Sequence, residues 1–356
     1  MKITYDGQIF GWQRYGGISR LFSKIILNLS KYKPIDLKVL GNFYKCEYFT
    51  ENEKNIFLNS KYLKEGFEIP GKFLQILNRP RHEITSDIFH ETYYDGFSAK
   101  LSKNTIRVIT VFDIIQEKFP QYNYFYNNIL NSKKKSILRA DHIISISNST
   151  KKDLIEFYNI NPEKISVVHL GHELNSLDEG KRLIEEDYIL YVGNRRNYKN
   201  FILLVKSVSN LNFQGITIVA FGGEKVSQNE SKLYKKYNVK IKYLSGDDIV
   251  LSNLYKYALV FVLTSFYEGF GIPPLEAMSK GCPTICSNTS SIPEVVGNAS
   301  LLFNPSQKDS LSLQLNKIIF DHSLRKKLIK LGYLRSKLFS WEKCSKETYE
   351  VYKKLF

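Results

Sequence analysis

The strongest constraint on the fold is a regular alternation of short apolar segments with segments of helical periodicity. Strands separated by helices in this way form parallel sheets with helices on both faces. In the second half of the chain the apolar segments are 188–192, 216–221, 239–244, 258–263, 283–286 and 301–303. The pattern predicts an α/β fold with a doubly wound parallel sheet.

The first half of the chain shows the same rhythm. Its predicted strands are 2–10, 35–40, 87–90, 106–111, 142–147 and 165–170. After the first strand, apolar residues recur at helical spacing from Ile18 to Leu29. At 356 residues the chain exceeds the usual size of one core, and the polar stretch 171–187 has the composition of a linker. We therefore predict two domains of one architecture, 1–170 and 171–340.

The composition limits the partners and the compartment. The formal charge of +16 favours anionic partners, which include nucleic acid, anionic lipid and phosphorylated small molecules. Four cysteines are few for this length, and no zinc-ligand spacing surrounds them, so we expect reduced, structural thiols. The chain has neither a signal-peptide pattern at its N-terminus nor an apolar run of about 20 residues. We expect a cytoplasmic protein, and a peripheral attachment to the inner membrane face remains open.

One segment joins a predicted strand to a helix through glycines. After the apolar run 258–263 the sequence reads T-S-F-Y-E-G-F-G-I-P-P-L-E-A-M-S-K-G-C-P. Glycines let a backbone approach a ligand closely, and the free amides of a helix start suit phosphate. Glu268 and Glu276 could accept hydrogen bonds from sugar hydroxyls. The alternative is a solvated helix with two ordinary surface glutamates.

A second loop carries an unusual cluster of cations. The segment Y-V-G-N-R-R-N-Y-K-N-F follows the strand 188–192 and places Arg195, Arg196 and Lys199 before a helix whose buried face begins at Phe201. Cations at a helix N-terminus oppose its dipole by about 0.3–1 kcal/mol each. An unfavourable local choice of this kind indicates a functional site for an anion.

A third glycine loop lies near the N-terminus. In D-G-Q-I-F-G-W-Q-R-Y-G-G-I-S-R-L-F, Gly16 and Gly17 stand at the entrance of the predicted helix from Ile18. They are explained either by a tight turn that packs helix on sheet or by a second phosphate-binding loop.

The run E-G-F-G-I-P-P-L-E-A-M-S-K-G-C-P resembles the glutamate pair and glycine turn of retaining GT-B glycosyltransferases, in particular family 4 of bacterial surface-polysaccharide enzymes. The loops around Gly16 and Arg195 are similar to loops of the same group. The resemblance implies two Rossmann-like domains that face a central cleft. It also implies that the last helix, 341–356, packs back on the first domain.

Residue roles follow from the same resemblance. Glu268 would contact the transferred sugar and Glu276 the ribose, while Arg195 and Lys199 would neutralise the departing diphosphate. Arg196 would be a neighbour on the surface. The positions that the resemblance assigns to donor binding are Gly16, Gly17, Gly193, Arg195, Lys199, Leu244, Ser245, Glu268, Gly269, Phe270, Gly271, Ile272 and Glu276.

The chain departs from the family pattern after the strand 106–111. Phe112 stands where the family usually has a histidine, and Gln116 stands where it has a proline. His90 and Asp113 are the nearest candidates to supply the missing polar contact near the acceptor or the reacting sugar. A histidine at a strand end is more often structural.

The resemblance implies a retaining, metal-independent hexosyltransferase. It would use a GDP-, UDP- or dTDP-linked sugar and a sugar or polyprenyl-linked glycan acceptor in O-antigen, capsule or lipopolysaccharide assembly, with mannose transfer as one candidate. No cofactor and no metal are expected, because side chains and helix ends would stabilise the diphosphate. The alternatives are a nucleotide-sugar-binding protein without transferase activity, suggested by Phe112, and a nucleic-acid binder, suggested by charge alone. The sequence contains no nucleic-acid recognition motif, so no nucleic-acid partner is expected.

Overall fold

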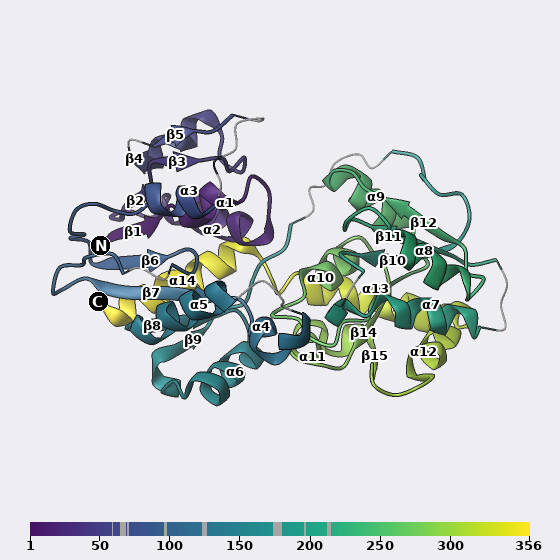
Figure 1. Cartoon of the computed structure of the whole chain (residues 1–356). Coiled ribbons are helices and arrows are strands. Elements are labelled where there is room, and N and C mark those ends of the chain that lie inside the picture. Colours follow the sequence, from purple (N-terminus) through teal and green to yellow (C-terminus); the bar gives the residue numbers. More distant parts are fainter. Residues whose placement is uncertain are drawn as a thin grey trace. The chain divides into compact units, whose positions relative to one another are not determined.

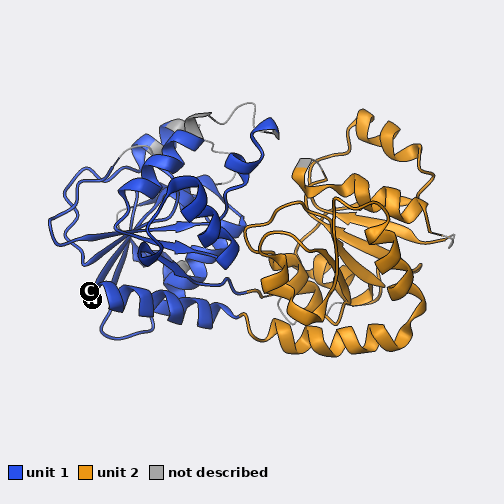
Figure 2. Ribbon diagram, turned by 90° about the horizontal axis from the view of Figure 1, so that it is seen from below, with its two compact units in different colours: residues 1–171, 340–356 blue, residues 172–339 orange. Residues whose placement is uncertain are grey.

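The computed structural model describes residues 1–58, 60–64, 69, 71–95, 98–122, 127–173, 180–195, 197–211 and 215–356. It divides into two compact units (Figures 1 and 2). Unit 1 comprises residues 1–171 and 340–356, and unit 2 comprises residues 172–339.

Unit 1 is built on a seven-stranded sheet with the order β4-β2-β1-β6-β7-β8-β9, in which every neighbouring pair is parallel. Its strands are β1 (Lys2–Asp6), β2 (Asp36–Leu40), β4 (Phe57–Leu58), β6 (Ile88–Glu91), β7 (Ile106–Val111), β8 (His142–Ser145) and β9 (Ile165–Val167). Its helices are α1 (Gln8–Trp12), α2 (Gly17–Leu29), α3 (Gly71–Leu77), α4 (Ile115–Lys118), α5 (Asn127–Arg139), α6 (Asn148–Tyr158) and α14 (Trp341–Leu355). A small sheet pairs β3 (Phe43–Tyr44) with β5 (Lys61–Tyr62).

Helix α14 belongs to unit 1 although it comes last in the sequence. It lies beside α2, where Asn28 donates a hydrogen bond to Ser345 at 3.2 Å. Tyr352 reaches the sheet and shares a 2.8 Å hydrogen bond with the hydroxyl of Tyr5 on β1. The end of the chain therefore completes the core of its beginning.

Unit 2 contains a six-stranded, all-parallel sheet with the order β12-β11-β10-β13-β14-β15. Its strands are β10 (Tyr188–Val192), β11 (Thr217–Phe221), β12 (Ile241–Leu244), β13 (Val260–Leu263), β14 (Thr284–Ser287) and β15 (Leu301–Phe303). Its helices are α7 (Phe201–Ser209), α8 (Gln228–Lys235), α9 (Asp248–Tyr257), α10 (Ile272–Ser279), α11 (Ile292–Val296), α12 (Ser310–Phe320) and α13 (His322–Ser336). The order reverses between β10 and β13, and ligands of open α/β sheets bind outside the carboxyl ends of strands at such a point.

The predicted α/β class and the parallel sheets are confirmed, and most strand positions agree within a few residues. The core of unit 2 packs Phe201, Leu204 and Val205 of α7 against the sheet, and all three are fully buried. The four cysteines are buried free thiols, as expected. Part of the predicted linker, residues 174–179, lies outside the described residues.

One local prediction is wrong. The first strand ends at Asp6 instead of reaching residue 10, because the chain turns at Gly7 into α1 and buries Phe10 against Phe49 and Phe57. At the start of α6 the hydroxyl of Ser147 caps the helix and accepts a 3.0 Å hydrogen bond from the amide of Thr150.

Candidate active site

The loop between β13 and α10 holds the largest group of predicted donor-site residues. It ends at Gly271, whose φ of 108° is one that residues with a side chain rarely adopt. A Cβ atom at this position would also lie 2.6 Å from Cδ1 of Ile292. Both constraints require glycine, and the turn that it makes starts α10.

The start of α10 offers few backbone donors. Pro273 and Pro274 occupy the first turn and have no amide hydrogen. The amides of Gly271 and Ile272 therefore supply the donors nearest to the helix start, together with the positive end of the helix dipole. This geometry suits a single phosphate group.

Lys199 and Glu268 meet beside this loop. Lys199 ends a 3₁₀ turn (Asn197–Lys199) that follows β10, and its Nζ lies 2.8 Å from one carboxylate oxygen of Glu268 and 3.0 Å from the other. Their side chains are 23% and 13% exposed. The pair is therefore partly screened by solvent and still accessible to a ligand.

Hydroxyl groups that the sequence analysis did not single out hold this pair in place. Ser265 donates to Glu268 at 2.6 Å, and Ser290 accepts the amide of Glu268 at 2.8 Å. Ser291 donates to the carbonyl oxygens of Glu268 and Phe270 at 2.8 and 2.7 Å. Thr264 donates to the carbonyl of Lys199 at 2.8 Å. The signal in the sequence was a run of serines and threonines directly after two strands that are neighbours in the sheet.

Arg195 points to a different part of unit 2. Its guanidinium donates to the carbonyl of Gly222 at 3.1 Å and to that of Glu224, and it lies over the ring of Tyr243. Its Nε is 3.6 Å from Glu230, and the residue is 6% exposed. In this conformation Arg195 ties together the loops after β10 and β11, and no described contact joins it to Lys199. Arg196 lies outside the described residues.

The remaining donor positions of unit 2 lie at or after the carboxyl ends of strands β10, β12 and β13. Gly193 has a φ of 123° and donates its amide to Phe221 at 2.9 Å. Leu244 accepts the amide of Gly222 and is half-buried, whereas Ser245 is exposed. Gly269 is buried within the loop after β13.

Glu276 lies on α10 and is almost buried. The residue is 6% exposed, and the hydroxyl of Tyr255 donates to it at 3.3 Å. Burial and the neighbouring carboxylate raise the pKa of Tyr255 well above its usual value, so this hydroxyl keeps its proton. Tyr255 thus orients the carboxylate that the resemblance assigned to the ribose.

Gly16 and Gly17 begin helix α2 in unit 1. Gly16 has extended backbone, and a Cβ there would lie 2.3 Å from the side-chain oxygen of Gln13. That oxygen accepts the amide of Ser19 at 3.1 Å. One of the free amides at this helix start is therefore already satisfied by the protein itself.

His90, predicted as a site residue, lies instead in the core of unit 1. It is fully buried, with Nδ1 2.5 Å from the hydroxyl of Tyr352 and Nε2 2.9 Å from that of Thr110. Burial lowers its pKa to about 3, so the ring is neutral. Because both ring nitrogens are occupied and no surface is exposed, His90 gives a substrate nothing to contact.

Asp113 keeps access to solvent. Its side chain is 34% exposed and lies 3.7 Å from Nζ of Lys133, and one oxygen accepts the amide of Ile115 at 3.1 Å. Phe112 is buried against Phe22. Of the two candidates to replace the missing histidine, only Asp113 remains.

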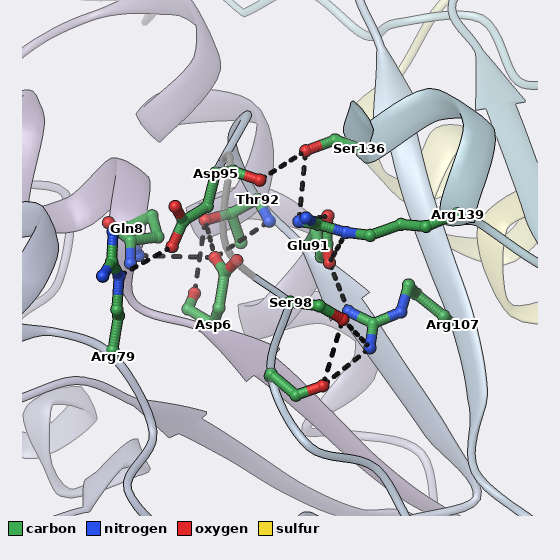
Figure 3. Close-up of polar contacts among 11 residues, drawn as sticks. Asp6, Gln8, Arg79, Glu91, Thr92, Asp95, Ser98, Arg107, Ser136 and Arg139 are labelled. Atoms are coloured by element: carbon green, nitrogen blue, oxygen red, sulfur yellow. Dashed lines mark hydrogen bonds and ion pairs between the residues drawn. The ribbon is translucent and has the colours of Figure 1, made fainter. Parts of the chain in front are cut away.

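A buried polar network occupies the carboxyl ends of β1 and β6 (Figure 3). Arg139 holds Glu91 through two hydrogen bonds of 3.1 and 2.9 Å, and Arg107 donates to the same carboxylate. Thr92 donates its amide at 2.9 Å and its hydroxyl to one oxygen of Asp6. Burial, and to a smaller degree Glu91, raise the pKa of Asp6 to about 7. This network could not be predicted from the sequence, because its members come from segments that are far apart in the chain.

The described residues contain no group of three or more histidine, cysteine or acidic side chains placed to hold a metal ion. Within the same ranges, no helix is long and apolar enough to cross a bilayer.

Two protein-family models match the chain. The model for glycosyl transferases group 1 covers residues 177–335, and the model for glycosyltransferase family 4 covers residues 16–176. Together they span nearly the whole sequence.

Individual relatives support the same grouping. The chain is 28% identical over 305 residues to O-antigen chain mannosyltransferase B of Escherichia coli, which covers 78% of this chain and 79% of that protein. It is 27% identical over 285 residues to the serotype-specific mannosyltransferase WbdA of the same organism, with 71% of this chain and 34% of WbdA covered. The chain thus spans about a third of WbdA. Among solved structures, sucrose-phosphate synthase from Thermosynechococcus elongatus matches with a TM-score of 0.72 at 18% identity, over 100% of this chain and 98% of that one.

Proposed function

Because the chain belongs to the group 1, family 4 glycosyltransferases with the GT-B fold, we propose that it is a retaining, metal-independent mannosyltransferase of O-antigen assembly. The mannose donor and the O-antigen product are suggested by the names of the two E. coli relatives. The observation that carries the proposal is the Lys199–Glu268 pair beside the glycine turn at Gly271.

The donor diphosphate would lie at the start of α10. The amides of Gly271 and Ile272 would donate to one phosphate, and the ammonium of Lys199 would neutralise the charge that develops as the sugar departs. Arg195 would contribute only after leaving its present partners, the carbonyl groups of Gly222 and Glu224. We therefore assign the larger share of diphosphate stabilisation to Lys199.

Glu268 would then accept a hydroxyl of the transferred sugar. Its carboxylate is already oriented by Ser265 and by the backbone bond to Ser290. A positioned carboxylate also stabilises positive charge on the anomeric carbon in the transition state. Glu276, oriented by Tyr255, would accept hydroxyls of the ribose.

The transfer step needs no separate base to remove the proton of the acceptor hydroxyl. The acceptor oxygen forms a bond to the anomeric carbon on the face from which the diphosphate leaves, and the bond between that carbon and the phosphate oxygen breaks. The hydroxyl proton passes to the departing phosphate oxygen. Configuration at the anomeric carbon is retained, and the products are the glycoside and the nucleoside diphosphate. The acceptor would be a sugar or a polyprenyl-linked glycan.

The decisive experiment incubates purified protein with GDP-mannose, UDP-hexoses and dTDP-rhamnose together with a lipid extract of the source cells. We expect transfer from GDP-mannose, an α-linked product by NMR, and unchanged rates in EDTA. A β-linked product refutes retention, and loss of activity in EDTA that a divalent cation restores refutes metal independence. Donor binding without transfer to any acceptor would support a sugar-nucleotide-binding protein instead, the alternative that Phe112 suggests.

A further inference from the structure

Helix α13 of unit 2, labelled in Figure 1, carries charged side chains of one sign only, which is positive. Between His322 and Ser340 the sequence contains six lysine and arginine residues and no aspartate or glutamate. The two arginines face inward. Arg325 donates to the carbonyl oxygens of Ile318 and Ile319 at 2.6 Å, and Arg335 donates to that of Val295 at 2.8 Å. The lysines are left to the surface.

These lysines have no anionic partner among the described residues. Lys326, Lys327, Lys330 and Lys337 are all exposed, and none of them forms an ion pair within the described ranges. On the N-terminal side the nearest carboxylate in sequence, Asp321, caps the helix by accepting the amide of Leu324 at 2.8 Å. Two of the lysines stand in the first turns, where they oppose the helix dipole. The outer face of α13 is therefore a strip of uncompensated positive charge.

Exposed apolar side chains lie within the same strip. Leu334 is 58% exposed, Leu338 50% and Tyr333 43%, while Leu313 and Phe320 on the adjoining α12 are 61% and 62% exposed. These two helices and the turn directly after α13 carry five of the 16 large apolar side chains that are exposed in the described residues. Within α13, positions 327, 330 and 334 follow helical spacing and share one face, and Leu338 lies in the turn that follows the helix. Lysines and apolar side chains are thus both exposed on these two neighbouring helices, and we call their exposed side the α12–α13 face.

We propose that the α12–α13 face docks on an anionic membrane surface. Phospholipid headgroups supply the negative charge that the lysines lack, and the upper acyl region accepts leucine and phenylalanine side chains while lysine stems extend to the headgroups. A nucleic acid would satisfy the charge but would leave Leu334, Leu338 and Phe320 in water. Docking at this face does not depend on the proposed reaction, although it would hold the enzyme near a polyprenyl-linked acceptor.

The test is flotation of the full-length protein with vesicles of phosphatidylcholine alone or mixed with phosphatidylglycerol. We expect binding to the mixed vesicles only, with an affinity that falls as salt is raised. Each lysine near such a surface changes affinity about five-fold, so the variant K326E/K330E/K337E should bind at least about 100-fold more weakly. The variant L334S/L338S should weaken the binding that persists at high salt.

A matched variant separates this face from the general charge of the protein. K232E/K235E/K236E reverses three exposed lysines at the end of α8 in the same unit and makes an equal charge change. We expect it to bind mixed vesicles within about five-fold of the unmodified protein. Thermal melts and nucleoside diphosphate titrations without vesicles check that both variants fold and keep the donor site, so a failed donor site is recognised separately.

Three results would overturn the inference. The first is an equal loss of vesicle binding in both triple variants. The second is no binding of the unmodified protein to the mixed vesicles. The third is binding to duplex RNA that is as tight as vesicle binding and unchanged in L334S/L338S, which would assign the face to nucleic acid.

Discussion

Replacing Glu268 with glutamine should tighten the binding of a nucleoside diphosphate while it impairs sugar transfer. In the structure the Lys199 ammonium is shared by both carboxylate oxygens of Glu268, at 2.8 and 3.0 Å. If Lys199 binds the diphosphate, a bound diphosphate must compete with that carboxylate. Glutamine keeps the shape of the side chain and a bond to Ser265 but removes the competing charge.

The size of the effect follows from the environment of the pair. An effective dielectric constant of about 20 would give the contact roughly 6 kcal/mol of Coulomb energy, an upper bound that omits solvation. The two side chains are 23% and 13% exposed, so most of this Coulomb energy is offset by lost hydration and by screening. Removing the competing carboxylate should therefore favour diphosphate binding by about 1–2 kcal/mol, which corresponds to about 5- to 30-fold tighter binding.

Isothermal titration calorimetry with GDP and UDP measures this change directly. The control is Lys199→Met, alone and combined with Glu268→Gln, because the gain must vanish when Lys199 is absent. Transfer by Glu268→Gln should fall by about 10²–10³, since the carboxylate would act on the sugar in the transition state. Unchanged or weaker diphosphate binding in Glu268→Gln would refute the assignment of Lys199 to the diphosphate.

Three further predictions concern stability. Because the pKa of Asp6 is raised to about 7 in the folded protein, the contribution of Asp6 to stability is full below about pH 4 and is lost as pH rises through about 7. Asp6→Asn should remove this loss, which is at most about 4 kcal/mol. Identical pH profiles of thermal melting in the two proteins would contradict this prediction. Glu91→Gln leaves two arginines without their carboxylate and should cost about 3–5 kcal/mol. This cost should appear as a fall in melting temperature of about 10 °C, and a fall under about 2 °C would show that these buried ion pairs contribute little to stability. Gly271→Ala should lower the melting temperature by several degrees and weaken diphosphate binding, because of the positive φ and the contact with Ile292, whereas Gly17→Ala meets no atom within 4 Å and should leave stability unchanged.

Local sequence patterns predicted most of the architecture. Apolar runs of strand length are limited by the turn residues that flank them, so 188–192 and 301–303 agree with β10 and β15 to the residue. The helix after Gly16 was equally visible, because its buried residues recur at helical spacing. The segment 43–81 has no clear hydrophobic period in its sequence, and the structure forms several very short elements there, among them β3, β4 and β5.

The donor-site loops were also readable, because strand, glycine turn and helix are contiguous in the sequence. Lys199 and Glu268 lie 69 residues apart, yet both follow strands that are neighbours in the sheet, β10 and β13. A parallel sheet brings the carboxyl ends of neighbouring strands together. Their pairing could therefore be expected once the strand order was known.

Side-chain partners depended on the tertiary structure. His90 was a site candidate by its place at a strand end, but only the packing of α14 shows that Tyr352 and Thr110 occupy both of its nitrogens. Arg195 matched the family pattern, yet its direction is decided by the carbonyl groups of the next loop. Sequence spacing carries no information about which rotamer such a long side chain adopts.

From sequence alone one could establish two parallel-sheet domains, the positions of three glycine loops and the family to which they point, since these depend on contiguous residues and on periodicity. Only the folded chain could show the buried network around Asp6 and Glu91, the serines that hold Glu268, and the fact that no carboxylate of the described residues pairs with the exposed lysines of α13. Each of these depends on distances between residues that are remote in sequence, and burial, which sets their charges and partners, exists only after folding.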